Sequence, residues 1–137
     1  MFSDPASNIA KLGLTDGMKV VDLGAGSGFY SIEAAQKIGS TGRVYAVEVQ
    51  KDLLERLRSV AAHEGLRNIE AVWGDVEKIG GTKLREAIAD RVIASNIIFQ
   101  IAKLEDFALE VKRILKPGGR VLIVDWSDVS PIGPKTV

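Results

Sequence analysis

The chain has 137 residues, of which 18 are basic, 18 are acidic and none is cysteine. The balanced charge gives no overall field that would favour nucleic acid or an acidic membrane surface. Without cysteine, disulfides and thiolate metal sites are excluded, and no apolar run approaches the roughly 18 to 20 residues of a membrane span. We therefore expect one soluble, cytoplasmic domain over residues 1–137, with no metal site, no membrane contact and an irregular tail over residues 126–137.

Short apolar runs alternate with amphipathic stretches along the chain, and glycines or prolines separate them. The expected elements in chain order are a helix over 5–12, a strand over 18–23, a helix over 29–38, a strand over 43–48, a helix over 51–64, a strand over 69–73, a weaker helix over 82–89, a strand over 91–95, a helix over 104–115 and a strand over 120–125.

Five near-continuous apolar strands that alternate with helices predict an α/β domain with a parallel sheet covered on both faces. Right-handed crossovers in a Rossmann-like, doubly wound sheet give the strand order 3-2-1-4-5, with a switch point between the first and fourth strands. Such sheets bind ligands outside the carboxyl ends of their strands. The residues that follow each strand are therefore the candidates for a site.

A glycine loop and an acid follow the first two expected strands. The loop Gly24-Ala25-Gly26-Ser27-Gly28 comes directly after the first strand, where missing side chains let backbone amides approach a ligand. Glu48 ends the second strand, where a carboxylate can accept hydrogen bonds from a ribose diol. The spacing differs from the dinucleotide pattern G-x-G-x-x-G, because Phe29 stands where that pattern needs its third glycine.

Polar residues also follow the next two strands. Asp75 comes after the third strand, where it can accept a hydrogen bond from an adenine amino group, and Val76 beside it can pack on the base. Ser95 and Asn96 follow the fourth strand. Because these ends meet at one edge of a parallel sheet, the residues together indicate a site for a nucleoside-containing ligand.

The segment from Asp22 to Gly28 resembles the D/E-x-G-x-G-x-G motif of class I S-adenosylmethionine-dependent methyltransferases. Residues 90–100 and the turn from Leu115 to Val121 resemble the family's fourth-strand segment and its L-K-P-G-G turn, so the resemblance extends from about Asp16 to Trp126. It implies S-adenosylmethionine as cofactor, S-adenosylhomocysteine as product, and methyl transfer to an unidentified acceptor, a small molecule or RNA. The cofactor-binding residues that it implies, together with the strand-end pattern, are Asp22, Gly24, Ala25, Gly26, Gly28, Tyr30, Glu48, Val49, Asp75, Val76, Ser95 and Asn96.

No catalytic residue can be carried over from the resemblance, because Gln100 stands where family members often have histidine. Asp125, Asp128 and Tyr30 are candidate bases, each with a stronger structural interpretation, and methyl transfer needs no dedicated base. His63 complements the dipole at the end of its helix. A non-catalytic cofactor-binding or partner subunit stays open as an alternative, as does an NAD-dependent oxidoreductase.

The last expected strand has an uninterrupted apolar core, Val121-Leu122-Ile123-Val124. The resemblance implies a sixth and a seventh strand beyond it, and the residues after 125 do not have a strand pattern. We expect the fifth strand to lie at the edge of the sheet, where apolar strands are rarely left open. The sequence therefore predicts a homodimer that uses this edge, and a truncated gene stays open as the alternative explanation.

Overall fold

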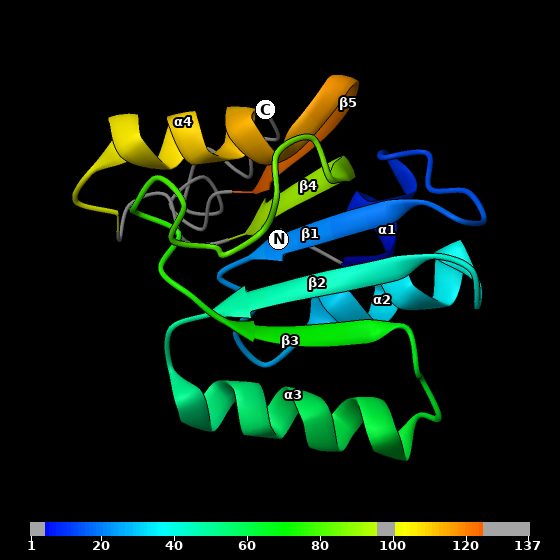
Figure 1. The fold of residues 1–137 in the computed structure, drawn as a ribbon. Helices are drawn as coiled ribbons and strands as arrows, with labels where there is room; N and C mark the ends of the chain where they lie inside the picture. Colours follow the sequence, from blue (N-terminus) through cyan, green and yellow to red (C-terminus); the bar gives the residue numbers. More distant parts are fainter. Residues whose placement is uncertain (1–4, 96–100, 125–137) are drawn as a thin grey trace, which may run out of the picture.

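The computed structural model describes residues 5–95 and 101–124. It contains a five-stranded parallel sheet in the order β3-β2-β1-β4-β5, which confirms the predicted topology (Figure 1). The elements are α1 (Pro5–Ala10), β1 (Lys19–Leu23), α2 (Phe29–Ile38), β2 (Arg43–Glu48), α3 (Lys51–His63), β3 (Ile69–Trp73), β4 (Ala89–Ser95), α4 (Leu104–Ile114) and β5 (Leu115–Val124).

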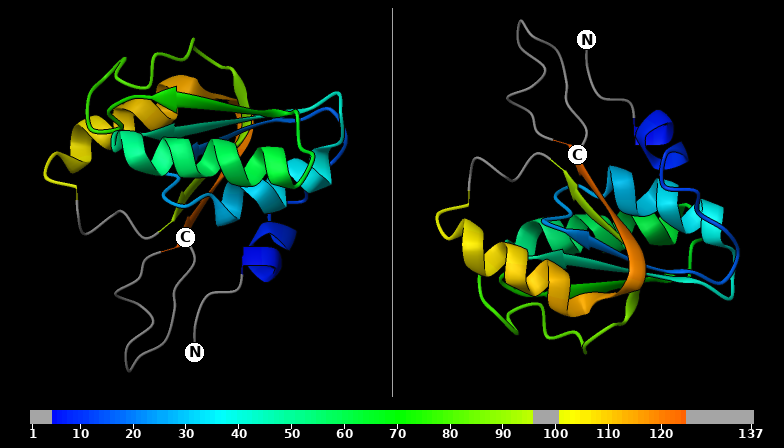
Figure 2. Two further views of the ribbon diagram at one scale, coloured as in Figure 1. Left: turned by 90° about the horizontal axis from the view of Figure 1, so that it is seen from below. Right: turned by 90° about the horizontal axis from the view of Figure 1, so that it is seen from above.

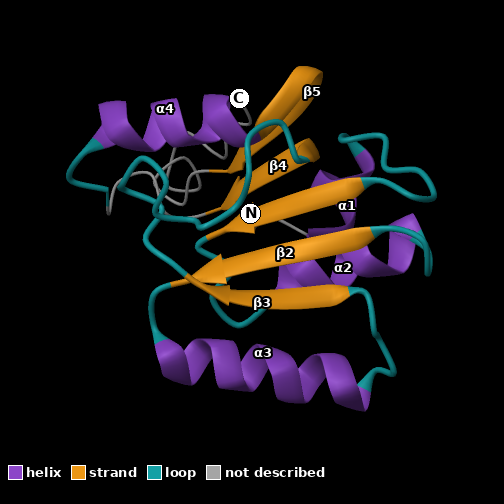
Figure 3. Cartoon of the chain, in the orientation of Figure 1, coloured by secondary structure: helices purple, strands orange, loops and turns teal. Residues whose placement is uncertain are grey.

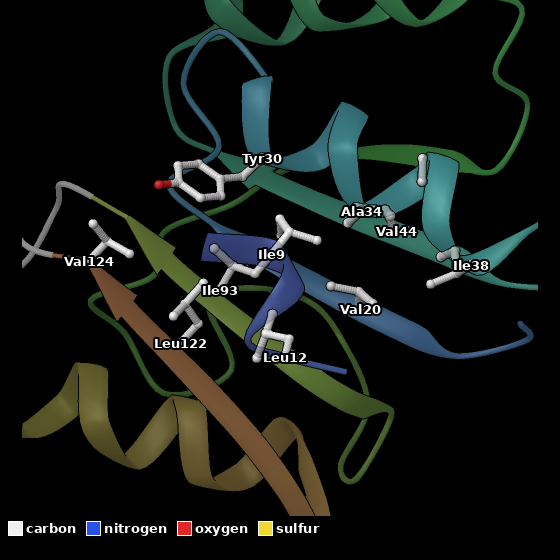
Figure 4. Packing of buried hydrophobic residues seen from close by; sticks show 11 residues of the cluster. Ile9, Leu12, Val20, Tyr30, Ala34, Ile38, Val44, Ile93, Leu122 and Val124 are labelled. Atoms are coloured by element: carbon white, nitrogen blue, oxygen red, sulfur yellow. The ribbon is translucent and has the colours of Figure 1, made fainter. Parts of the chain in front are cut away.

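Helices cover both faces of the sheet. α1 and α2 lie on one side and α4 lies on the other, while α3 packs along β2 and β3 (Figure 2). The two cores that result explain the continuous apolar strands. Val20 belongs to the core under α1 and α2 (Figure 4), and its neighbour Val21 belongs to the core under α4. Successive side chains of a strand point to opposite faces, so every position of β1 from Val20 to Leu23 is buried.

The predicted helix over residues 82–89 is wrong. This segment forms turns and irregular chain before β4 begins at Ala89 (Figure 3). Lys83 and Ala87 have left-handed backbone angles, with φ of 64° and 52°, and such angles do not occur inside an α-helix. Contacts with α4 favour this conformation, because the Thr82 hydroxyl donates to Glu110 on that helix. Tertiary hydrogen bonds thus override a weak local helix propensity.

The last strand begins earlier than the sequence predicts. β5 starts at Leu115 rather than residue 120, and it pairs with β4 from Ala89↔Leu115 onward. The register then shifts before Arg91↔Arg120, so the turn with Gly118 (φ 81°) lies inside a bulge of the strand pair. A short backbone irregularity therefore replaces the separate turn that the sequence indicates.

Candidate cofactor site

A pocket of about 670 Å³ lies at the carboxyl ends of the strands, at the switch point between β1 and β4. Its size is typical of small-molecule sites. The residues that line it are Pro5, Gly24, Ala25, Gly26, Ser27, Phe29, Tyr30, Glu48, Val49, Gln50, Leu53, Gly74, Asp75, Val76, Glu77, Ser95 and Ile101.

The pocket brings together most of the residues that the sequence singled out. Those that line it are Gly24, Ala25, Gly26, Tyr30, Glu48, Val49, Asp75, Val76 and Ser95. Asp22 and Gly28 do not line it, and Asn96, Asp125, Asp128 and the tail over residues 126–137 lie outside the described residues. The candidate residues chosen from the sequence did not include Pro5, Ser27, Phe29, Gln50, Leu53, Gly74, Glu77 and Ile101.

Two of the missed residues carried a usable signal. Ser27 lies inside the glycine motif, and Gln50 follows the acid at the end of β2. Pro5 and Ile101 reach the pocket only through the packing of distant elements, so no local pattern could have identified them.

The glycine loop is folded tightly over the end of β1. The amides of Gly24 and Ala25 both donate to the carbonyl of Val47, at 2.8 and 3.0 Å. Gly24, Gly26 and Gly28 all have positive φ angles. Gly28 has a packing role as well, because a Cβ atom there would lie 2.2 Å from Leu57 Cδ1. Gly28 therefore serves helix packing and not the pocket wall, because its missing side chain allows α2 and α3 to approach each other.

Glu48 connects the glycine loop to the turn after β2. Its buried carboxylate accepts a hydrogen bond from the Gly26 amide at 2.8 Å through Oε1, and from the amides of Val49 and Gln50, both at 3.1 Å, through Oε2. A carboxylate has about four acceptor positions. Capacity therefore remains for a hydroxyl group in the pocket that Glu48 lines.

Asp22 lies beneath the glycine loop and is completely buried. The Ser31 hydroxyl donates to its Oδ2 at 2.7 Å, whereas Oδ1 has no hydrogen-bond partner among the described residues. Burial raises the pKa of Asp22, hydrogen bonds from Ser31 lower it and the charge of Glu48 raises it, so that the pKa is about 7. The fold thus holds a carboxyl group that titrates near neutral pH directly below the loop.

The Asp75 side of the pocket is a compact loop after β3. The Asp75 Oδ1 atom accepts from the amide of Glu77 at 2.9 Å, which orients the carboxylate. The Gly74 amide donates to the Glu48 carbonyl at 3.2 Å, and this bond joins the loop to the end of β2. Trp73, in β3 as predicted, adds a second link, because its Nε1 donates to the Val49 carbonyl at 2.8 Å.

The other aromatic and titratable candidates have structural contacts. Tyr30 is buried beside the pocket, and its hydroxyl accepts from Asn8 Nδ2 at 2.8 Å. His63 lies in the last turn of α3, as expected.

Within the described ranges, no three His, Cys, Asp or Glu side chains are grouped so that they could hold a metal ion. No helix in those ranges has the length and apolar character needed to cross a membrane.

The fold and the pocket define a doubly wound α/β domain with a candidate nucleoside site at its switch point. Residues 14–133 match the family model of a methyltransferase domain, and the chain belongs to this family.

Curated relatives and solved structures agree with this family. An arsenite methyltransferase of Halobacterium salinarum is 30% identical over 122 residues, which are 86% of this chain and 29% of that protein. A protein-L-isoaspartate O-methyltransferase of Methanothrix thermoacetophila is 32% identical over 82% of this chain and 49% of its own length. The crystal structure of a SAM-dependent methyltransferase from Aquifex aeolicus has a TM-score of 0.81 at 30% identity, over 90% of this chain and 64% of that one. The chain thus spans less than two thirds of each of these proteins.

Proposed function

We propose that the domain binds S-adenosylmethionine and transfers its methyl group to an acceptor, with S-adenosylhomocysteine as the second product. The observation that supports this proposal most strongly is the convergence of the glycine loop, Glu48 and Asp75 on one pocket at the switch point of the sheet. The family match over residues 14–133 supports the same chemistry.

The residues of the pocket fit this cofactor. Glu48 offers a carboxylate to the ribose hydroxyls, and Asp75 offers one to the adenine amino group. Val49 and Val76 provide apolar surface for the base. Asp22 contributes negative charge below the loop when it is ionised, which favours the positively charged methionine end of the cofactor there.

The bound cofactor supplies an electrophilic methyl group on a positively charged sulfur. The protein's own contribution is alignment and exclusion of water, because the reaction is an in-line displacement. Holding the adenine, ribose and methionine parts at three different strand ends fixes the cofactor relative to the rest of the pocket. Tyr30, Ser95 and Ile101 line the pocket as well.

We propose that the acceptor is a small organic molecule or RNA. A cysteine-free chain fits a reducing compartment, and we propose the cytoplasm as its location.

Calorimetric titration tests the cofactor. S-Adenosylmethionine and S-adenosylhomocysteine are expected to bind, and NAD is not, because the glycine spacing departs from the dinucleotide pattern. Labelled methyl transfer into pools of small molecules and RNA then tests turnover. Tighter binding of NAD would contradict the proposal and favour an oxidoreductase. Cofactor binding without transfer to broad pools, protein included, would favour a non-catalytic subunit.

We also propose that the domain forms a homodimer through the edge of β5. In the described part of the chain β5 is the last strand of the sheet and pairs only with β4. Leu122 and Val124 are buried and Ile123 is half-buried, so β5 has the apolar character of an interior strand although it is last in the sheet. Sedimentation at micromolar concentrations is expected to show a dimer. A monodisperse monomer at every concentration would contradict this prediction.

A further inference from the structure

Glu110 is a completely buried acid on α4, and it does not line the pocket. It accepts five hydrogen bonds. The Arg113 Nε and Nη2 atoms donate from 2.7 Å, the Gly80 amide from 2.8 Å, and the Thr82 hydroxyl and amide from 2.5 and 3.4 Å. Burial alone would raise the pKa of Glu110, but the hydrogen bonds from Arg113, Thr82 and Gly80 lower it to about 2. The carboxylate is therefore charged at any physiological pH.

Buried ion pairs contribute little net stability, since desolvation offsets their attraction, and some of them instead select one arrangement of the chain. At Glu110 the partners show which arrangement is selected. Arg113 comes from the same helix, but Gly80 and Thr82 belong to the long connection between β3 and β4. Glu110 therefore determines where this connection lies on α4.

The position of residues 80–82 directly constrains the position of Asp75. The Asp75 amide donates to the Gly81 carbonyl at 3.0 Å. The two backbones are also in close contact, because a Cβ atom on Gly81 would lie 2.1 Å from the Asp75 carbonyl oxygen, and one on Gly74 would lie 2.7 Å from the Gly81 oxygen. Residues 80–82 cannot shift toward the pocket without displacing Asp75.

A second link joins the same loop to the start of α4. The Glu77 Oε1 atom accepts from the amides of Ala102 and Lys103, at 2.9 and 3.2 Å. These bonds are exposed, so water competes with them, whereas the Glu110 side chain is completely buried and its two bonds from Thr82 are buried. The buried link is therefore the one that sets the position of the loop.

We propose that Glu110 is a positioning residue for the cofactor: through Gly80 and Thr82 it holds the loop that presents Asp75 to the adenine amino group. This inference rests on the proposed function, because it assumes that adenine binds beside Asp75. It adds that selectivity for the amino group depends on a carboxylate that never contacts the cofactor.

The test compares two ligands, S-adenosylhomocysteine and the analogue whose purine lacks the exocyclic amino group. Wild-type protein is expected to prefer the first by about tenfold or more, the size of one charge-assisted hydrogen bond. Glu110→Gln keeps the shape of the side chain but loses the charge, and Thr82→Val removes the hydroxyl at nearly constant volume. Each variant is expected to reduce the preference to about threefold or less. Glu55→Gln, at an exposed acid on α3, is the matched control and should keep the full preference.

The ratio of the two affinities separates positioning from stability, because a loss of folded protein weakens both ligands equally. An unchanged preference in folded variants, or an equal loss for both ligands, overturns the inference. If Glu110→Gln does not fold, the ligand preference of Thr82→Val tests the inference instead. Wild-type protein that binds neither ligand overturns the proposed function and the inference with it. If wild-type protein binds both ligands equally, Asp75 does not contact the adenine amino group. This outcome overturns the inference but leaves the proposed function standing.

Discussion

Replacing Asp22 by Asn is expected to stabilise the fold by up to about 4 kcal/mol at pH 8 relative to its effect at pH 4. The pKa of Asp22 is about 7 in the folded chain, whereas an ordinary aspartate has a pKa of 3.8. Well below pH 3.8 the group is protonated in both the folded and the unfolded state and does not affect stability. As pH rises from about 4 through 7, Asp22 ionises first in the unfolded chain. Folding must then either remove the hydration of this charge or protonate the group, and both cost free energy. Stability is therefore lost over this window, and the neutral amide of Asn removes the loss.

Urea unfolding of both proteins at pH 4, 6 and 8 measures this effect. Asp52→Asn, at an exposed acid of α3, is the matched control and should show only a small pH-dependent difference. A destabilisation by Asp22→Asn that is equal at pH 4 and pH 8 would show that the carboxyl group is not titrating in this range. Since the charge of Asp22 also supports the proposed methionine end of the site, the stabilised variant is expected to bind S-adenosylmethionine more weakly.

Glu48→Ala is expected to weaken the binding of S-adenosylhomocysteine by about 1.5–3 kcal/mol, the range for charge-assisted hydrogen bonds. We expect the upper part of this range because the variant removes two interactions at once. The ribose hydroxyls lose their acceptor, and the amide of Gly26 loses the bond that holds the glycine loop. Calorimetric titration of both proteins measures the loss.

The fold should survive this change, because the amides that Glu48 binds border the pocket, where water can replace the carboxylate. Thermal unfolding checks that point. Glu48→Gln, which keeps one acceptor oxygen but no charge, should fall between wild type and Ala. Glu70→Ala, at an exposed acid of β3 paired with Arg43, should bind normally. If Glu48→Ala binds as tightly as wild type, the ribose role of Glu48 is wrong.

The prediction of the helix over residues 82–89 shows where local patterns lose their value. Its propensity was weak, and Thr82 found hydrogen bonds on α4, 28 residues away in the chain. The long helices α2, α3 and α4 and the strands β1 to β4 were predicted with small errors at their ends, whereas β5 begins five residues before its predicted start. Their periodicity is repeated over many residues, so that single tertiary contacts cannot override it.

Some features of the candidate site could likewise be predicted from the sequence, and others could not. Glu48 and Asp75 could be found from the sequence because parallel strands bring their carboxyl ends to one edge, so that position after a strand implies position at the site. That Asp22 lies under the loop and not at the pocket wall depends on how α2 covers it through Ser31. Glu110 gave no signal, because an acid on an amphipathic helix normally faces water.

By itself, the sequence determined the class of fold, the order of the strands and the family. Hydrophobic periodicity and glycine spacing can be read from short segments, and a parallel sheet brings the ends of its strands together at one site. Only the tertiary structure decided which carboxylates are buried, what holds them, and that Pro5 of α1 and Ile101, before α4, reach the pocket. Burial and hydrogen bonding between distant segments depend on packing in three dimensions, and no local window of the chain contains that information.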